Sequence, residues 1–380
     1  MRPVLRGGFA ALRLIGGIMH SIATATARRR PRRLGVPRIN QEDLVLVAIA
    51  GRIADALMQP TPYRIGQDGG LRVLPGTGGI VINQRIGDRC VGLAADHIEP
   101  GVAVRNDYQH GGTRGNASAG LTALACIGNM AVVLDGPCAG RRGYVTGKHG
   151  GVDHVLIDFP TAVLRRLEIG NRVQIYACGV GMRLIEHPEI AIMNCSVRLL
   201  RRWGVRSEAD RLIAPVTHLI PAAIMGSGLG RNNSYLGDCD IQLFDPEIVR
   251  RFRLDRLRFG DLVAIVDADH RFGRSFRTGA MTIGIIIHSD STVSGHGPGV
   301  TTLLTGEARH LVPLRNPRAN LAEILGVRRL PPARAYTPLP QKDRTWSVGA
   351  PARTRQIPRM RDTARPGIRR QPPRRRLTAG

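Results

Sequence analysis

The chain contains few lysines, few aromatic residues and no closely spaced cysteines. Lys148 and Lys342 are its two lysines among 55 basic residues, and aromatic residues make up 4% of the 380 positions. We therefore expect a core built from Val, Ile, Leu and Ala. No two of the six cysteines have the C-x₂₋₄-C spacing of zinc fingers and redox motifs, which excludes both classes.

Long apolar runs are also missing. No stretch approaches the roughly 18 uninterrupted apolar residues of a membrane span. Residues 9–27 end in small residues like a signal-peptide cleavage site, but Arg13 and His20 interrupt the apolar region. Scattered cysteines in a chain of this size indicate reduced thiols. We therefore expect a cytoplasmic protein without a membrane partner.

The net charge of +26 is concentrated at the two ends of the chain. Residues 1–38 contribute +9 and residues 327–380 contribute +13, which leaves +4 for residues 39–326. Such Arg-rich and Pro-rich ends predict disordered arms that contact polyanions nonspecifically. Arms without any function fit the same composition.

Short β-branched runs punctuated by glycine are typical of a many-stranded β fold. The runs are Gly79–Ile82, Ala131–Leu134, Val155–Ile157, Val173–Tyr176, Leu262–Val266 and Ile283–Ile287. Short helices are expected at 161–167, 196–203, 246–252 and 317–325. We predict a mainly β protein, a β-rich α+β fold with a barrel or sandwich core and a few short helices. A glycine-rich break near residue 180 predicts two β-rich domains, 39–180 and 181–326.

Several nucleotide and hydrolase motifs can be set aside. Gly226–Gly230 has glycines in alternation, but the loop-forming residues Arg231–Ser234 follow where a dinucleotide fingerprint requires a helix. Gly143–His149 resembles a phosphate loop with one residue too few between its glycines. Neither H-E-x-x-H nor G-x-S-x-G occurs.

Acidic and histidine residues gather at the ends of strand-like runs. These residues are Asp96, His97, Glu99, Asp238, Asp240, Asp267, Asp269, His270, His288 and Asp290. Residues i and i+2 share one face of a strand, which pairs their side chains. Neighbouring carboxylates repel unless a cation lies between them. Asp, Glu and His without Cys are ligands of Zn²⁺, Mn²⁺ or Fe²⁺. One such pair is better explained by a turn-capping Asp or a satisfied core histidine, whereas for four in one core a shared polar site explains the pattern equally well.

Glycine-flanked histidines extend this set. His149 and His154 follow Lys148, and His296 lies within Gly295–Gly299. Glycine lets the backbone approach a ligand closely, although it also simply forms turns. We predict that a small-molecule ligand contacts His149, His154, Gly226, Gly228, Gly230, Asp238, Asp290 and His296.

At these residues the chain resembles the family called domain of unknown function 4438, found in bacteria and archaea. The likeness covers about residues 40–312. It is carried by Leu74–Gly76, Ala95–Val102, Val145–Gly151, Ile224–Gly230, Gly237–Ile241, Asp267–His270 and Gly295–Val300. The resemblance implies kinship without an activity. A shorter segment, Gly260–His270, is similar to formamidase-type amide hydrolases.

The leading hypothesis is a metal-dependent hydrolase of a small amide, lactam or ester. The predicted metal ligands, which should converge on one cavity, are Asp96, His97, Asp267, Asp269, His270 and His288. Glu99 or Asp240 is the expected general base. Lys148 and the amides of Gly226–Gly230 are expected to hold an oxyanion.

Two other classes remain as alternatives. A ligand-binding or scaffold protein without catalysis would place the same clusters at subunit contacts. Glycine-rich β folds often close their edges by self-association, so a homo-oligomer is expected. A nucleic-acid binder is disfavoured for the core, because the charge lies on arms without the interleaved aromatics that stack on bases.

Overall fold

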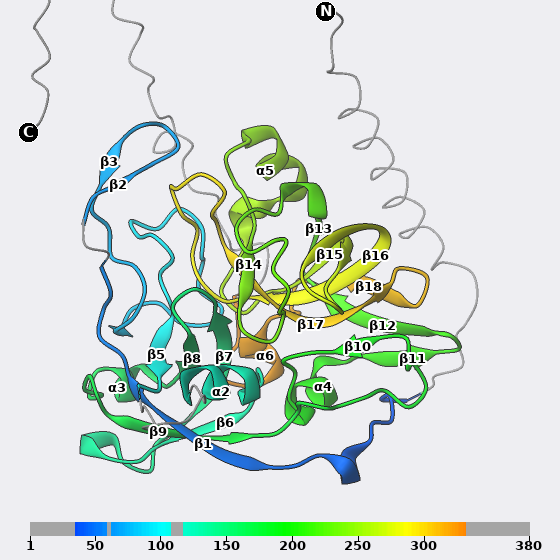
Figure 1. The fold of residues 1–380 in the computed structure, drawn as a ribbon, viewed down its shortest axis with the longest axis horizontal. Helices are drawn as coiled ribbons and strands as arrows, with labels where there is room; N and C mark the ends of the chain where they lie inside the picture. Colours follow the sequence, from blue (N-terminus) through cyan, green and yellow to red (C-terminus); the bar gives the residue numbers. More distant parts are fainter. Residues whose placement is uncertain (1–34, 59–61, 108–116, 332–380) are drawn as a thin grey trace, which may run out of the picture. The chain divides into compact units, whose positions relative to one another are not determined.

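Six strands of the N-terminal half close into a barrel in the computed structural model, which describes residues 35–58, 62–107 and 117–331. The strands are β1 (Val47–Ile53), β5 (Gly101–Arg105), β6 (Met130–Val133), β7 (Arg142–His149), β8 (His154–Asp158) and β9 (Arg172–Ala177). Their order is β1-β9-β6-β7-β8-β5, and β1 completes the ring by pairing with β5 (Figure 1). The two-residue strand β4 (Ile80–Val81) adds to β5 outside the ring.

Glycine is required where β1 passes from one neighbour to the other. A Cβ atom on Gly51 would lie 2.6 Å from Val104 Cγ1 and 2.7 Å from the Arg105 carbonyl oxygen. Around the ring, alternate side chains such as Val173, Ile175 and Val133 are buried while their neighbours are more exposed. This period of two is the pattern of strands with one face in a core.

A second sheet is built from the C-terminal half. Its strands are β10 (Ala191–Ile192), β13 (His218–Pro221), β14 (Asp238–Asp240), β15 (Leu262–Asp269), β16 (Ser275–Ile286) and β17 (Gly299–Glu307). The main order is β10-β17-β16-β15-β13, and β14 pairs with the first residues of β17. The barrel lies at the lower left of Figure 1 and this sheet at the upper right.

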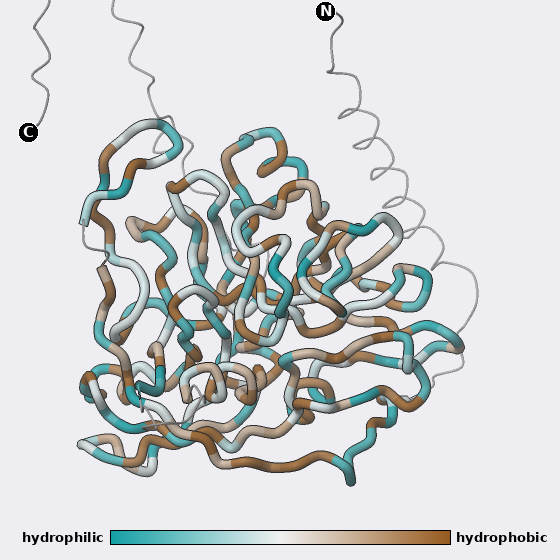
Figure 2. Tube along the Cα trace, in the orientation of Figure 1, coloured by the Kyte–Doolittle hydropathy of each residue, from teal (hydrophilic) through white to brown (hydrophobic). Residues whose placement is uncertain are grey.

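Strand β15 is buried along its whole length because it separates two apolar cores. Leu262, Ala264 and Val266 face the core shared with the barrel strands. Val263 and Ile265 face a second core, which contains Phe252, Leu257 and Phe259. Figure 2 shows hydrophobic segments running through the interior of the fold. Burial on both faces explains the continuously apolar sequence of this strand.

The remaining elements are short. They comprise β11 (Arg206–Glu208), β12 (Arg211–Val216) and β18 (Leu311–Arg315) in a three-stranded sheet, the hairpin β2 (Arg64–Ile65) and β3 (Leu71–Arg72), and the helices α2 (Ala117–Leu124), α3 (Thr161–Leu164), α4 (Val197–Trp203), α5 (Pro246–Phe252) and α6 (Leu321–Ile324). Four 3₁₀ turns, η1 (Gln41–Asp43), η2 (Gly136–Cys138), η3 (Ala222–Ile224) and η4 (Leu254–Arg256), complete the described part. Helix α5 follows its N-cap Asp245, whose side chain accepts hydrogen bonds from the amides of Glu247 and Ile248. The mainly β prediction is confirmed.

Barrel and second sheet meet along β7. The Thr301 hydroxyl donates to the Lys148 carbonyl oxygen at 3.1 Å, and the Gly150 amide donates to Asp238 Oδ1 at 2.8 Å. A Cβ atom on Gly237 would lie 2.6 Å from Gly150 Cα, so two glycines allow the backbones to touch. The end of β7 is thereby held against β14, the strand that carries Asp238 and Asp240.

In the described part of the chain, no helix has the length and apolar character needed to cross a membrane. The six cysteines lie in this part and are free thiols. The described residues extend past 326 to 331, and Arg328 donates to the Ile86 carbonyl oxygen and to Asp88. The arms lie largely outside the described residues, and both their predicted disorder and the division near residue 180 stay predictions.

Candidate metal centre

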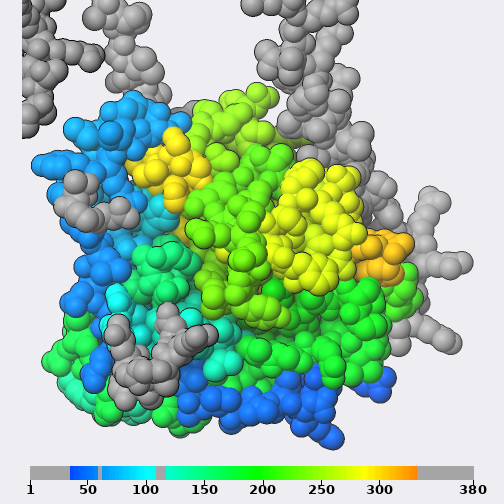
Figure 3. Space-filling model, viewed as in Figure 1, coloured from blue at the N-terminus to red at the C-terminus, as the bar shows by residue number. Residues whose placement is uncertain are grey.

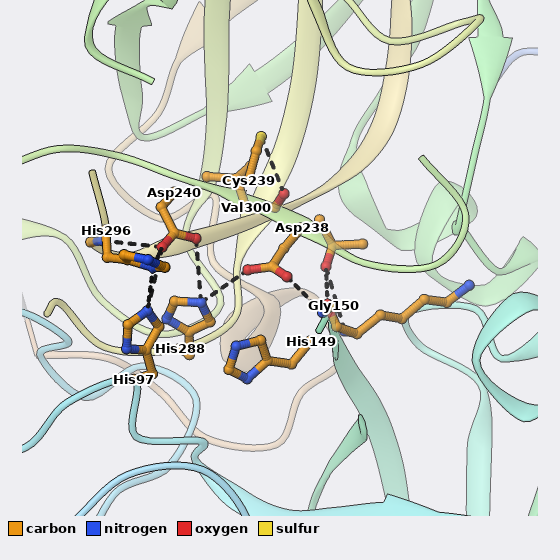
Figure 4. Close-up of polar contacts among 12 residues, drawn as sticks. His97, His149, Gly150, Asp238, Cys239, Asp240, His288, His296 and Val300 are labelled. Atoms are coloured by element: carbon orange, nitrogen blue, oxygen red, sulfur yellow. Dashed lines mark hydrogen bonds and ion pairs between the residues drawn. The ribbon is translucent and has the colours of Figure 1, made fainter. Parts of the chain in front are cut away.

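Six side chains from both halves of the fold converge where the barrel meets the second sheet. They are His97 from the loop before β5, His149 at the end of β7, Asp238 and Asp240 on β14, and His288 and His296 from the connection between β16 and β17. Figure 4 shows the four imidazoles gathered against the two carboxylates of β14. The predicted convergence of His97 with His288 is therefore seen, with ring centroids 4.9 Å apart.

One group of three ligand atoms forms a tight triangle. His296 Nδ1 lies 3.0 Å from His97 Nε2 and 3.1 Å from Asp240 Oδ2. The third edge, His97 Nε2 to Asp240 Oδ2, is 3.5 Å. We call this group the outer triad, because the His296 side chain is 35% exposed. Its loop lies at the surface beside the hairpin β2–β3, joined to it by a bond from the Gln67 amide to the Thr292 carbonyl oxygen (Figure 3).

A second group, the inner triad, consists of His149, Asp238 and His288. His288 Nε2 lies 2.9 Å from Asp238 Oδ2, and the three ligand atoms all lie within 4.8 Å of one another. The rings of His149 and His288 are 4.4 Å apart between centroids. All three side chains are nearly inaccessible, with His288 at 0%. This group is enclosed by protein.

Three of the four imidazoles are oriented by an acceptor behind them. His97 Nδ1 contacts Asp96 Oδ1 at 2.8 Å, and His149 Nδ1 contacts Glu99 Oε1 at 2.6 Å. His288 Nδ1 contacts the Ser289 carbonyl oxygen at 2.8 Å. With Nδ1 used in this way, each ring turns Nε2 toward the centre of the cluster. Histidines that bind metals are held in the same manner by carboxylates and carbonyls.

The His288 ring places positive charge between the two carboxylates. A carbonyl oxygen can accept but never donate, so Nδ1 of His288 carries a hydrogen. Its Nε2 then faces Asp238 at 2.9 Å and Asp240 Oδ1 at 3.6 Å. Without a metal ion this contact requires a second proton, and the two carboxylates raise the pKa of His288 well above its usual value despite the burial that opposes the charge. A metal ion can replace that proton.

The two carboxylates of β14 are held ionised. Burial alone would raise the pKa of Asp240, but hydrogen bonds from His288, His296 and His97 hold it well below its ordinary value. The pKa of Asp238 is lowered by His288 against the same effect of burial. Cys239 between them points away into the second core. Strand alternation therefore places both acids on one face, as their i, i+2 spacing predicts.

Local backbone features shape the cluster. His97 has a left-handed φ of 59°, a conformation that costs a non-glycine residue about 1–3 kcal/mol. It is held by bonds from its own amide to the Asp290 carbonyl oxygen and from the Ile98 amide to the Ser289 hydroxyl. A Cβ atom on Gly299 would lie 2.2 Å from Asp238 Oδ2 and 2.3 Å from His288 Nε2. Glycine is therefore needed there, a role that sequence reasoning missed although Gly299 closes the segment chosen for His296.

The roles predicted for Glu99 and Asp96 are corrected by their contacts. Glu99 is fully buried and accepts bonds from His149, His154 and the Gly78 amide. Burial opposes its charge, but the two histidines hold the pKa of Glu99 far below its usual value, so it is a poor general base. Asp96 contacts His97 through Oδ1 and Arg64 through Oδ2. Both carboxylates orient imidazoles of the cluster, and His154 lies behind Glu99.

The predicted oxyanion group is not available for that task. Lys148 Nζ donates to Asn194 Oδ1 at 2.7 Å and to the carbonyl oxygens of Ala123 and Tyr235 at 3.2 Å. The amides of Gly226 and Gly230 donate to the carbonyl oxygens of Asp240 and Arg274. A Cβ atom on Gly228 would lie 2.5 Å from the Asp238 carbonyl oxygen. This loop therefore packs against β14 and positions the acids.

Asp267, Asp269 and His270 have partners other than the cluster. Strand β15 continues through Asp269, with a bulge at Asp267, whose φ is 64°. The i, i+2 spacing predicts that Asp267 and Asp269 share one face of the strand, but the bulge breaks this alternation. Asp267 accepts the Gly279 amide, and Asp269 is paired with Arg271 and Arg277. His270 contacts the Thr302 hydroxyl at 2.7 Å. These three residues are therefore not supported as metal ligands.

Asp290 is likewise a structural residue. Its Oδ2 accepts the Gly92 amide at 2.7 Å, and its carbonyl oxygen accepts the His97 amide at 3.2 Å. The predicted pairing of Asp290 with His288 does not form, because His288 turns to Asp238. Asp290 instead fastens the loop that carries His97 to the segment that carries His288.

Sequence comparison places the chain in a family. Residues 63–201 match "Domain of unknown function (DUF4438), N-terminal", and residues 202–325 match its C-terminal counterpart. The chain belongs to the DUF4438 family. A solved structure described as "Crystal structure of TM1086" is 39% identical, covers 76% of this chain and 99% of that one, and superposes with a TM-score of 0.71. No curated protein matches the chain. The family description states no activity.

Proposed function

We propose that this DUF4438 protein is a metal-dependent hydrolase whose metal centre is the cluster of His97, His149, His288 and His296 with Asp238 and Asp240. The observation that carries the proposal is the orientation of the imidazoles. Three rings use Nδ1 on an acceptor behind them and turn Nε2 toward two ionised carboxylates. Protons on the rings or a metal ion at the centre can balance the charge of the carboxylates, and the donor set suits Zn²⁺, Mn²⁺ or Fe²⁺.

The side chains around the cluster are suited to holding and orienting a metal ion and are poorly suited to transferring protons. Asp240 remains ionised at neutral pH and, with its pKa well below the usual range, is a weak base. Lys148 and the Gly226–Gly230 loop are engaged elsewhere. A bound divalent ion would lower the pKa of a water molecule and polarise a carbonyl oxygen, the two tasks that these residues leave open.

The access to the centre supports a small substrate. His296 is the most exposed of the six side chains, at 35%, whereas the other five are at 8% or less. A reacting group would therefore approach along the His296 loop. We propose a small amide, lactam or ester as the substrate class, because a polarised carbonyl and a water nucleophile are what such bonds require.

Metal content tests the proposal first. Protein purified without an affinity tag and reconstituted with Zn²⁺, Mn²⁺ or anaerobic Fe²⁺ is expected to retain metal after gel filtration. Gly299→Ala should lose it, because the added methyl group occupies the space of Asp238 and His288. Gly120→Ala is the matched control, since a Cβ atom there has nothing within 4 Å and its φ is not left-handed.

Turnover tests it second. The loaded protein would be screened against small amides, lactams and esters, with Gly299→Ala alongside. Less than about a tenth of an equivalent of any metal after reconstitution would reject the metal centre. Metal retention and tight binding of a small molecule without product would instead favour a ligand-binding protein.

A further inference from the structure

We propose that the centre holds two metal ions, one in the outer triad and one in the inner triad, with Asp240 bridging them. This inference rests on the proposed function and adds the number of ions and the ligands of each. Each triad contains two imidazoles and one carboxylate. Six side chains exceed the four ligands of a single tetrahedral ion and would leave no open position on a single octahedral one. Two triads of three each leave positions open for water and substrate.

The outer triad already has the dimensions of a coordination sphere. Atoms bound to one ion at about 2.0–2.2 Å with angles between 90° and 110° lie about 2.8–3.6 Å apart. The three edges between His97 Nε2, His296 Nδ1 and Asp240 Oδ2 measure 3.0, 3.1 and 3.5 Å. An ion can therefore be placed among them with little movement of the side chains.

The inner triad is assembled from different atoms. His288 Nε2 and Asp238 Oδ2, at 2.9 Å, form one edge of the expected size. His149 completes the group and is fixed from behind by Glu99 at 2.6 Å. Its ligand atom lies within 4.8 Å of the other two, close enough for the three side chains to close around one ion.

Asp240 is the residue that joins the triads. Its Oδ2 faces His296 and His97 of the outer triad, whereas its Oδ1 lies 3.6 Å from His288 of the inner triad. A carboxylate that presents separate oxygens to two sets of ligands has the arrangement of a bridge. Paired ions with shared ligands recur in hydrolases, where both stabilise charge on the reacting oxygens.

The two positions differ in access. His296 gives the outer triad contact with solvent, whereas the inner triad has side chains that are 0%, 5% and 8% exposed. We therefore expect the outer ion to exchange readily and the inner ion to exchange slowly. A brief treatment with a chelator should remove one ion before the other.

Metal stoichiometry of the full-length, tag-free protein tests the inference. We expect about two equivalents of Mn²⁺ or Zn²⁺ at saturation and about one after brief chelation. His296→Ala should bind about one equivalent and keep its fold, because the side chain is partly exposed. His310→Ala is the matched control: its contacts are with the Asp210 carbonyl oxygen and Glu189, away from the cluster, and this variant should still bind two equivalents.

Magnetic coupling between the two ions of the Mn²⁺-loaded wild type gives a second readout. A bridged pair should show the electron paramagnetic resonance spectrum of coupled ions, which Asp240→Asn should convert to that of isolated ions. One equivalent at saturation, unchanged by His296→Ala, would overturn the two-ion inference and leave a single-ion centre intact. Absence of bound metal would instead reject the proposed function itself.

Discussion

At the scale of residues, the partner of a carboxylate decides its role. Asp238 and Asp240 contact the ring nitrogens that point to the centre of the cluster, where the proposed metal ions would lie. Asp96 and Glu99 contact the Nδ1 atoms of His97 and His149, which point away from the centre of the cluster, and so orient these imidazoles. All four are buried acids beside histidines, and composition alone does not separate the two roles. The decisive quantity is which ring nitrogen each one contacts.

Glu99→Gln tests the orienting role. The amide offers one acceptor where the carboxylate serves His149, His154 and the Gly78 amide, so His149 should lose its fixed orientation. We expect metal affinity to fall about 10–100-fold, the usual cost of losing such a partner. Competition with a chelating dye measures it. Glu186→Gln, an exposed acid paired with Arg38, is the control, and equal affinity in both variants would refute the role.

At the scale of elements, the site depends on the end of β7 being held against β14. Thr301, Gly150 and Gly237 make the direct contacts. The buried Lys148 side chain strengthens this junction. Its ammonium group donates to Ala123 in helix α2, to Asn194, and to Tyr235 in the segment before β14. A buried lysine with three acceptors is a structural link. We therefore expect its loss to affect folding and to leave the bound metal of the folded molecule unchanged.

Lys148→Met should lower the free energy of unfolding by about 1–3 kcal/mol at pH 7, because three acceptors lose a donor. Burial lowers the pKa of Lys148 to about 8, below the unfolded value of about 10.4. Between these values the unfolded chain binds more protons, so the contribution of Lys148 to stability rises with pH. The difference between wild type and variant should widen by up to about 3 kcal/mol from pH 8 to 10.4. Urea denaturation at several pH values measures it, and a constant difference would contradict the assignment.

Local patterns predict the strands and part of the site. Val173–Tyr176 and Leu262–Val266 form strands because their side chains suit one and two buried faces. Asp238 and Asp240 share a face through a spacing of two. Asp267 and Asp269 have the same spacing, yet a bulge and the neighbouring arginines give them other partners. Nothing in the spacing distinguishes these two pairs.

The spacing of residues along the sequence does not predict which distant residues come into contact. The contact of His97 with His296 joins residues 199 positions apart, and that of Glu99 with His149 joins residues 50 apart. Both depend on closure of the barrel and on its docking against the second sheet. The glycines beside His149 and His296 predicted that two backbone segments approach closely. In the structure these glycines let β7 and the loop 288–298 pack directly against β14.

At the scale of the whole chain, most of the positive charge and the proposed metal centre belong to different segments of the sequence. The centre is built entirely from described residues, which lie within one compact unit. Most of the charge belongs to residues 1–38 and 327–380, +22 of the total +26. Some arginines near these boundaries serve the fold, because Arg38 pairs with Glu186 and Arg328 with Asp88. A shortened chain should therefore retain residues 35–331.

Nucleic-acid binding of the full and shortened chains tests that separation. The arms should bind duplex DNA weakly and in a strongly salt-dependent manner, because each neutralised phosphate releases counterions. The chain of residues 35–331 should lose nearly all of this affinity while keeping its metal content and its unfolding midpoint. Fluorescence anisotropy at low and at physiological salt measures the binding, and metal analysis controls for the integrity of the fold. Tight, salt-resistant binding by residues 35–331 would place a nucleic-acid site on the core and contradict the separation.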